Sequence, residues 1–190
     1  GIGYRKTSLS ISNLDEQLAN RALISLEAEM ERRQRLFAAA GEGVDNITEY
    51  LATRPLRLTA SADPHTAYAG AEFVVVATPT NYDPVTNGFD TRTVEAVIAE
   101  ARARAPDAVI VVRSTVPVGF VTRMRDQHGT DAILFAPEFL REGRALWDNL
   151  HPSRIVVGDT TPAAHRFADL LVEGAEATCP VVFTGSTEAE

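Results

Sequence analysis

The residues best suited to chemistry lie between Phe135 and Gly158, where two carboxylates, Glu138 and Glu142, stand four residues apart. A short apolar run ends there in a Pro–Glu pair, and a segment with helical character follows. Ligands of an open parallel sheet bind where strands give way to loops at their carboxyl ends. If the chain from Phe139 onward is helical, both carboxylates lie on one helix face and can point into one crevice. The spacing therefore predicts an acidic site at a sheet edge.

Two earlier apolar runs, residues 73–77 and 109–112, are also followed by hydroxyl-bearing residues, which include Thr80 and Thr115. The carboxyl ends of parallel strands share one edge of a sheet, so these hydroxyls are expected near Glu138. Thr80 and Thr115 therefore join the carboxylates as candidate site residues.

Each candidate also has a structural interpretation. Glu138 can stabilise the N-terminus of the helix that follows it, because acidic side chains are favourable there. Glu142 can be a solvated charge on that helix, and Thr80 and Thr115 can be turn hydroxyls.

The composition excludes several classes of protein. A length of 190 residues, 45% hydrophobic and 23% charged, suits one domain or one domain with a small appendage. The formal net charge of -8 argues against a nucleic-acid partner. No apolar run reaches the roughly 18 residues of a membrane span and no signal peptide opens the chain, so a cytoplasmic protein without a membrane partner is expected. The single cysteine, Cys179, excludes an internal disulfide, and the four histidines lack ligand spacing, so no metal site is predicted.

The elements that must position these residues alternate between strand and helix from Leu56 onward. Strand-length apolar runs lie at 73–77, 109–112, 133–135, 155–157 and 181–183. Helices are predicted over about 90–105, capped by Asp90 or Thr91, over about 121–128 with Gly129 as its end, and from Pro162. Repeated βα units predict an α/β fold, with a partial Rossmann-like, mostly parallel sheet and flanking helices.

Residues 12–41 differ from the rest, because apolar residues recur there at helical spacing until Gly41 and Gly43. They predict one long N-terminal helix, either packed on the sheet or available to a partner. We therefore divide the chain into a helical segment, 1–48, and a Rossmann-like domain, 49–190. Gly1-Ile2-Gly3-Tyr4 begins like a dinucleotide fingerprint, but Lys6 occupies the place of the third glycine, so no pyrophosphate loop is predicted.

The later part of the chain closely resembles the NAD-binding domain of the UDP-glucose/GDP-mannose dehydrogenase family. The resemblance runs from about Glu49 to Glu190 and favours the UDP-glucose branch of the family, the UDP-glucose 6-dehydrogenases. It is carried by the strings ATPTNYD at 77–83, RSTVPVG at 113–119, PEFLREG at 137–143, the segment 148–157, and STEAE at 186–190.

Such enzymes oxidise the C6 alcohol of UDP-glucose to the carboxylate of UDP-glucuronate with two molecules of NAD in turn. The aldehyde is held on a Cys thiolate, oxidised to a thioester and hydrolysed. The resemblance implies that Glu138 activates the hydrolytic water and that Thr115 helps to hold it.

The resemblance also implies how the ligands are bound. Thr80, Thr115 and Glu142 would line the NAD side of the site, and Phe139 and Leu140 would contact the sugar nucleotide. Cys179 lies outside the glycine-rich motif that carries the family's nucleophile, so a structural role is expected for it.

Residues 5 to 48 depart from that family pattern. They look like a segment of FtsK/SpoIIIE-type translocases and type VII secretion ATPases, through NLDEQL at 13–18 and ERRQRL at 31–36. No P-loop is present, so ATP hydrolysis is not expected. The pattern predicts a composite chain joined near residues 49–55.

We further expect the chain to be inactive alone. The family's catalytic Lys would lie just past Ser186–Glu190, and its catalytic Cys and uridine-binding domain beyond residue 190. The alternative is a non-catalytic scaffold that binds a partner through the long helix. A sheet edge left uncovered by residues 5 to 48 would favour a homo-oligomer.

Overall fold

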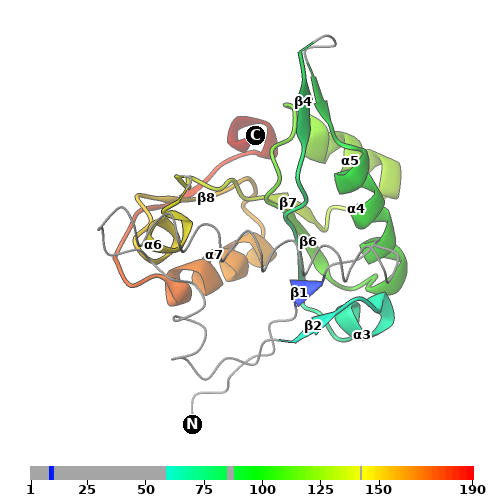
Figure 1. The fold of residues 1–190 in the computed structure, drawn as a ribbon, viewed down its shortest axis with the longest axis horizontal. Helices are drawn as coiled ribbons and strands as arrows, with labels where there is room; N and C mark the ends of the chain where they lie inside the picture. The colour runs from blue at the N-terminus through cyan, green and yellow to red at the C-terminus, as the bar shows by residue number, and fades with distance from the viewer. Residues whose placement is uncertain (1–8, 11–58, 85–87, 142) are drawn as a thin grey trace.

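The computed structural model describes residues 9–10, 59–84, 88–141 and 143–190 (Figure 1). The helix predicted over 12–41, the Gly1–Tyr4 string and Glu142 lie outside these residues. No helix within the described ranges is long and apolar enough to cross a membrane. The elements are β1 (Leu9–Ser10), β2 (Ala60–Ser61), α3 (Pro64–Tyr68), β3 (Phe73–Val76), β4 (Asn81–Asp83), β5 (Gly88–Asp90), α4 (Arg92–Arg104), β6 (Val109–Val112), α5 (Phe120–His128), β7 (Ile133–Phe135), α6 (Ala145–Leu150), β8 (Ile155–Val157), α7 (Pro162–Gly174), β9 (Val181–Phe183) and α8 (Ser186–Ala189).

The sheet is built around β6, which pairs in parallel with β3 on one side and with β7 on the other. A second parallel pair, β8–β9, lies beside β7, because the N–H of Gly158 donates to the carbonyl of Phe135 at 2.7 Å. The expected α/β fold with a parallel sheet and flanking helices is therefore confirmed. All five strand-length apolar runs form strands.

Strand β6 is covered on both faces. Ile110 and Val112 belong to the core cluster under α4 and α5, whereas Val111 between them belongs to the cluster under α7. All three residues have 0% exposure, which explains the unbroken apolar run in place of alternation. Figure 1 shows α4 and α5 on one side of the strands and α6 and α7 on the other.

The helix ends follow the predicted signals with one difference. Helix α5 ends at Gly129, in the left-handed conformation at φ +58°, and α7 begins at Pro162. Thr91 occupies the N-cap position of α4, but its hydroxyl donates to the Glu95 carboxylate and caps no backbone N–H. Asp90 accepts from the N–H of Arg92 at 3.1 Å instead.

The helix expected from Phe139 onward is wrong. Residues 137–141 are not helical, and α6 begins only at Ala145. Two features favour a non-helical conformation between Pro137 and Ala145: Gly143 has φ +81°, and the N–H of Arg141 donates to Asp148 at 2.8 Å. The four-residue helical register that would align two carboxylates therefore does not form.

Two strand pairs have no counterpart among the predicted elements. Strands β1 and β2 pair in parallel, and β4 and β5 form an antiparallel hairpin that extends away from the body in Figure 1. Tyr82 and Phe89 pair across this hairpin with ring centroids 5.3 Å apart. The sequence carries an Asn-Gly dipeptide, a strong hairpin signal, whose Gly88 is the first residue of β5.

Candidate functional site

The carboxyl ends of β6 and β7 open into one polar cavity of about 330 Å³. This volume falls at the lower end of the roughly 300–1,000 Å³ that ligand pockets occupy. It lies at the sheet edge where open α/β folds bind their ligands. Its lining consists of Arg113, Ser114, Thr115, Val116, Phe135, Pro137, Glu138, Leu140 and Glu190.

Ser114 fixes the loop after β6 against the loop after β3. Its hydroxyl donates to the carbonyl of Thr78 at 2.7 Å, and its N–H donates to the carbonyl of Val76 at 3.2 Å. Ser114 is 6% exposed, so these bonds are shielded from water. The next residue, Thr115, is exposed and lines the cavity, so buried hydrogen bonds set its position.

Glu138 is held by an ion pair from the neighbouring strand end. The Nε of Arg113 donates to its Oε1 at 2.7 Å, and the side chains are 11% and 38% exposed for Arg113 and Glu138 respectively. The nearly buried guanidinium thus fixes the direction of a carboxylate that still reaches solvent. No helix begins directly after Glu138, so its alternative role as a helix-stabilising carboxylate is wrong.

The loop that carries Phe139 and Leu140 is held at its far end by a second ion pair. Arg141 donates from Nε and Nη2 to the Asp148 carboxylate at 3.0 and 2.5 Å. The side-chain hydrogen bonds from Arg141, followed by its backbone N–H, lower the pKa of Asp148 to about 2. The loop is therefore fixed at Glu138 and again at Arg141.

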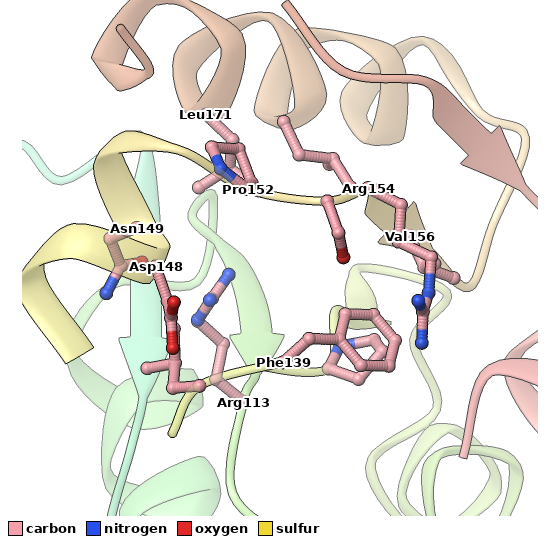
Figure 2. A pocket seen from close by; sticks show the side chains of 12 residues that line it. Arg113, Phe139, Asp148, Asn149, Pro152, Arg154, Val156 and Leu171 are labelled. Carbon is pink, nitrogen blue, oxygen red and sulfur yellow. The ribbon is translucent and has the colours of Figure 1, made fainter. Parts of the chain in front are cut away.

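A smaller cavity of about 50 Å³ also borders this loop and shares Arg113, Pro137 and Leu140 with the larger one (Figure 2). Phe139 and Arg154 face each other there, with the guanidinium carbon 3.9 Å from the ring centroid. Asp148 and Asn149 approach the same space from α6 (Figure 2). The cation over the ring favours one orientation of Phe139.

The structure brings some of the predicted site residues together and separates others. Thr115, Glu138 and Leu140 line the larger cavity, and Leu140 also lines the smaller one with Phe139. Thr80 follows β3 but lines neither cavity. Glu142 falls outside the described residues.

Sequence reasoning missed Arg113 and Glu190 as site residues. Arg113 directly follows β6 and lines both cavities, so its place at a strand end was a usable signal. Glu190 reaches the cavity from the C-terminal end of α8, where it is the C-cap residue. It lies 71 residues from its hydrogen-bond partner Gly119, and no local pattern predicts such a contact.

Other chemistry-bearing side chains have structural surroundings. Cys179 is partly buried and packs against the apolar cluster under α7. His151 stacks on Trp147 with centroids 3.8 Å apart, and His165 lies 3.9 Å from the ring centroid of Phe183. Across the ranges that the structure describes, no group of three or more His, Cys, Asp or Glu residues could hold a metal ion.

Comparison with known proteins places these features in a family. The profile of the UDP-glucose/GDP-mannose dehydrogenase family, NAD binding domain, matches residues 40–173. The chain is 45% identical over 151 residues to a UDP-glucose 6-dehydrogenase of Streptococcus pneumoniae, covering 76% of this chain and 38% of that protein. It is 36% identical over 192 residues to the enzyme of that name from Campylobacter jejuni, covering 100% of this chain and 48% of the relative. The chain thus spans less than half of either relative.

Solved structures agree on the fold. A UDP-glucose dehydrogenase from Pyrobaculum islandicum superposes with a TM-score of 0.65 at 24% identity, over 100% of this chain and 48% of that one. A GDP-mannose dehydrogenase from Pseudomonas aeruginosa superposes with a TM-score of 0.59 at 22% identity, over 70% of this chain and 33% of that one.

The Campylobacter alignment covers the whole chain, so it gives residues 5 to 48 a counterpart within the dehydrogenases. The translocase resemblance expected for that segment has no support. The family match also begins at residue 40, before the expected junction.

Proposed function

The chain belongs to the UDP-glucose/GDP-mannose dehydrogenase family, and on this premise we propose that it forms the cofactor-side part of an NAD-dependent UDP-glucose 6-dehydrogenase. The reaction is the oxidation of the C6 alcohol of UDP-glucose to the carboxylate of UDP-glucuronate. The observation that carries the proposal is the cavity of about 330 Å³ at the carboxyl edge, which Thr115 and Glu138 both line from neighbouring strand ends.

The cavity suits one end of a dinucleotide. It lies at the edge where such cofactors bind in doubly wound sheets, and Thr115 and Arg113 offer it hydrogen-bond donors. NAD, when bound, takes up the hydride that the C6 alcohol releases. The residues of this chain then serve to bind, to orient and to move protons.

Glu138 is the proposed base for the hydrolytic step. Its carboxylate takes a proton from water while the water oxygen bonds to the C6 carbonyl carbon of the thioester, and the C–S bond then breaks to give the carboxylate and release the Cys thiolate. Arg113 fixes the direction of that carboxylate through the 2.7 Å ion pair, and Thr115, which lines the same cavity, is proposed to hold the water. A carboxylate tied on one side and solvated on the other is suited to this transfer.

Phe139 and Leu140 are proposed to contact the sugar nucleotide, since they lie on the loop that ion pairs fix at both ends. Thr80 and Glu142 are proposed on the NAD side. For Thr80 this requires the ligand to extend past the cavity toward β3.

A ligand-binding titration tests the proposal. NAD at 100 times its Kd should stabilise the folded chain by about 2.7 kcal/mol. A chain of this size shifts its Tm by about 2–4 °C per kcal/mol, so a rise of about 5–11 °C is expected. Thr115→Ala should lessen the NAD shift, and Glu138→Gln should leave it largely intact because its role is in hydrolysis.

Glu173→Gln is the matched control, because Glu173 is an exposed carboxylate on α7 away from both cavities. A Tm that does not move with NAD would overturn the proposal. If Thr115→Ala and Glu173→Gln reduce the NAD-induced rise in Tm equally, the cavity is not the site at which NAD binds.

A further inference from the structure

The N-terminus of α5 has no side-chain cap of its own. Its N-cap residue is Gly119, in the left-handed conformation at φ +88°, and glycine has no side chain to accept from the first N–H groups of the helix. Those groups have no partner within the helix and must find acceptors elsewhere.

Glu190 supplies the missing acceptor. Its Oε2 accepts from the N–H of Gly119 at 2.5 Å, and its Oε1 accepts from the N–H of Val121 at 2.7 Å. Bonds to an ionised acceptor are roughly twice as strong as neutral ones. The negative charge also lies at the positive end of the helix dipole.

The packing of α8 aims Glu190 at α5. The backbone N–H of Glu190 donates to the carbonyl of Ser186 at 2.9 Å, and Ala189 packs against the core cluster under α4 and α5. Helix α8 can come this close because Gly158 has no side chain: a Cβ there would stand 2.8 Å from the Cβ of Ala189.

We propose that Glu190 is a positioning residue, which holds the loop 115–119, and with it Thr115, by capping α5 from another helix. The inference rests on the proposed function, because the position of Thr115 matters only if its cavity binds a ligand. Glu190 lines that cavity itself, yet both of its oxygens are engaged by α5. The N–H groups of Gly119 and Val121 therefore already have an acceptor.

The first test is independent of ligand. In ¹H–¹⁵N spectra of the full 190-residue chain, Glu190→Ala should move the amide protons of Gly119 and Val121 upfield and shift the Thr115 amide as well. Glu188→Gln is the control, because Glu188 is an exposed carboxylate on α8, two residues before Glu190. Shifts at Gly119 and Val121 without any at Thr115 would show a local cap only and overturn the inference.

The second test measures the Kd of NAD by calorimetry. Glu190→Ala should weaken binding roughly three- to tenfold, and Glu190→Gln, which keeps one acceptor oxygen, should recover part of it. In the Thr115→Ala background the same change should have no further effect, because Glu190 acts through Thr115. A residue with a merely structural role would lower the Tm in both backgrounds and leave the Kd of the folded chain unchanged. If the unaltered chain binds no NAD, the proposed function fails, and the Thr115 amide shift alone decides the role of Glu190.

Discussion

Replacing Gly158 with alanine should destabilise the chain through one identifiable contact. The added Cβ would stand 2.8 Å from the Cβ of Ala189, 3.0 Å from the Cα of Ser186 and 3.2 Å from the carbonyl oxygen of Phe135. Carbon atoms in van der Waals contact are about 3.5–4.0 Å apart. Two of the three neighbours are backbone atoms, so α8 must move away from the β7–β8 junction.

The size of the effect follows from overpacking. Extra methyl groups in a well-packed region cost about 1–3 kcal/mol, and a chain of about 150–250 residues loses about 2–4 °C in Tm per kcal/mol. Gly158→Ala should therefore lower the Tm by about 2–12 °C. Urea denaturation followed by the fluorescence of the single tryptophan, Trp147, measures the free energy of unfolding directly.

A matched control and a rescue make the reasoning refutable. A Cβ added at Gly174, on α7, would meet no atom within 4 Å, so Gly174→Ala should be neutral or stabilising by about 0.4–1 kcal/mol. Ala189→Gly removes the nearest atom and costs about 1 kcal/mol by itself. Combined with Gly158→Ala it should show a favourable coupling of about 0.5–3 kcal/mol. If Gly158→Ala is as stable as Gly174→Ala, or if the double variant shows no coupling, the close approach of α8 is refuted.

Three further predictions concern the loops and the core. The side-chain hydrogen bonds from Arg141 lower the folded-state pKa of Asp148 from 3.8 to about 2. The stability that this pair contributes is therefore complete above pH about 4 and is lost as the pH falls toward 2. Asp148→Asn should flatten that part of the acid-denaturation curve. Asp159→Asn should cost about 1.5–3 kcal/mol in urea denaturation, because it removes a charged bond of 2.6 Å from Arg125, and equal stability would refute that pair as a contributor. Ile110→Ala should cost about 2–5 kcal/mol, because its side chain is fully buried between β6 and the α4–α5 layer, and a loss under about 1 kcal/mol in the same assay would contradict that packing.

The sheet and its main helices could be predicted because their signals are local. Apolar runs of three to five residues mark the parallel strands β3, β6, β7, β8 and β9, and the stripe through Val94, Ile98 and Ala101 marks α4. Pro162 and Gly129 mark helix ends through backbone chemistry that depends on no distant partner. Each of these elements could therefore be predicted without knowledge of the rest of the molecule.

The loop after β7 could not be predicted in the same way. Helical spacing placed Glu138 and Glu142 on one face, but the bend at Gly143 and the capture of Arg141 by Asp148 interrupt the helix before it can form. Gly143 can adopt the left-handed conformation, but the sequence alone does not require it to do so. A four-residue spacing aligns two side chains only where a helix exists, and here no helix begins before Ala145.

The site itself depends on contacts between residues that are separated by increasing distances in the sequence. Arg141 and Asp148 are 7 residues apart, Arg113 and Glu138 are 25 apart, and Glu190 reaches Gly119 across 71. The positions of Thr115 and Glu138 could be predicted from the ends of their strands, because the carboxyl ends of parallel strands lie at one edge of the sheet. What holds those residues in place is a set of ion pairs and a cap whose partners meet only after the sheet has formed. Variants at Arg113 or Glu190 should therefore alter the site while leaving the sheet intact, whereas variants at the strand cores should remove both together.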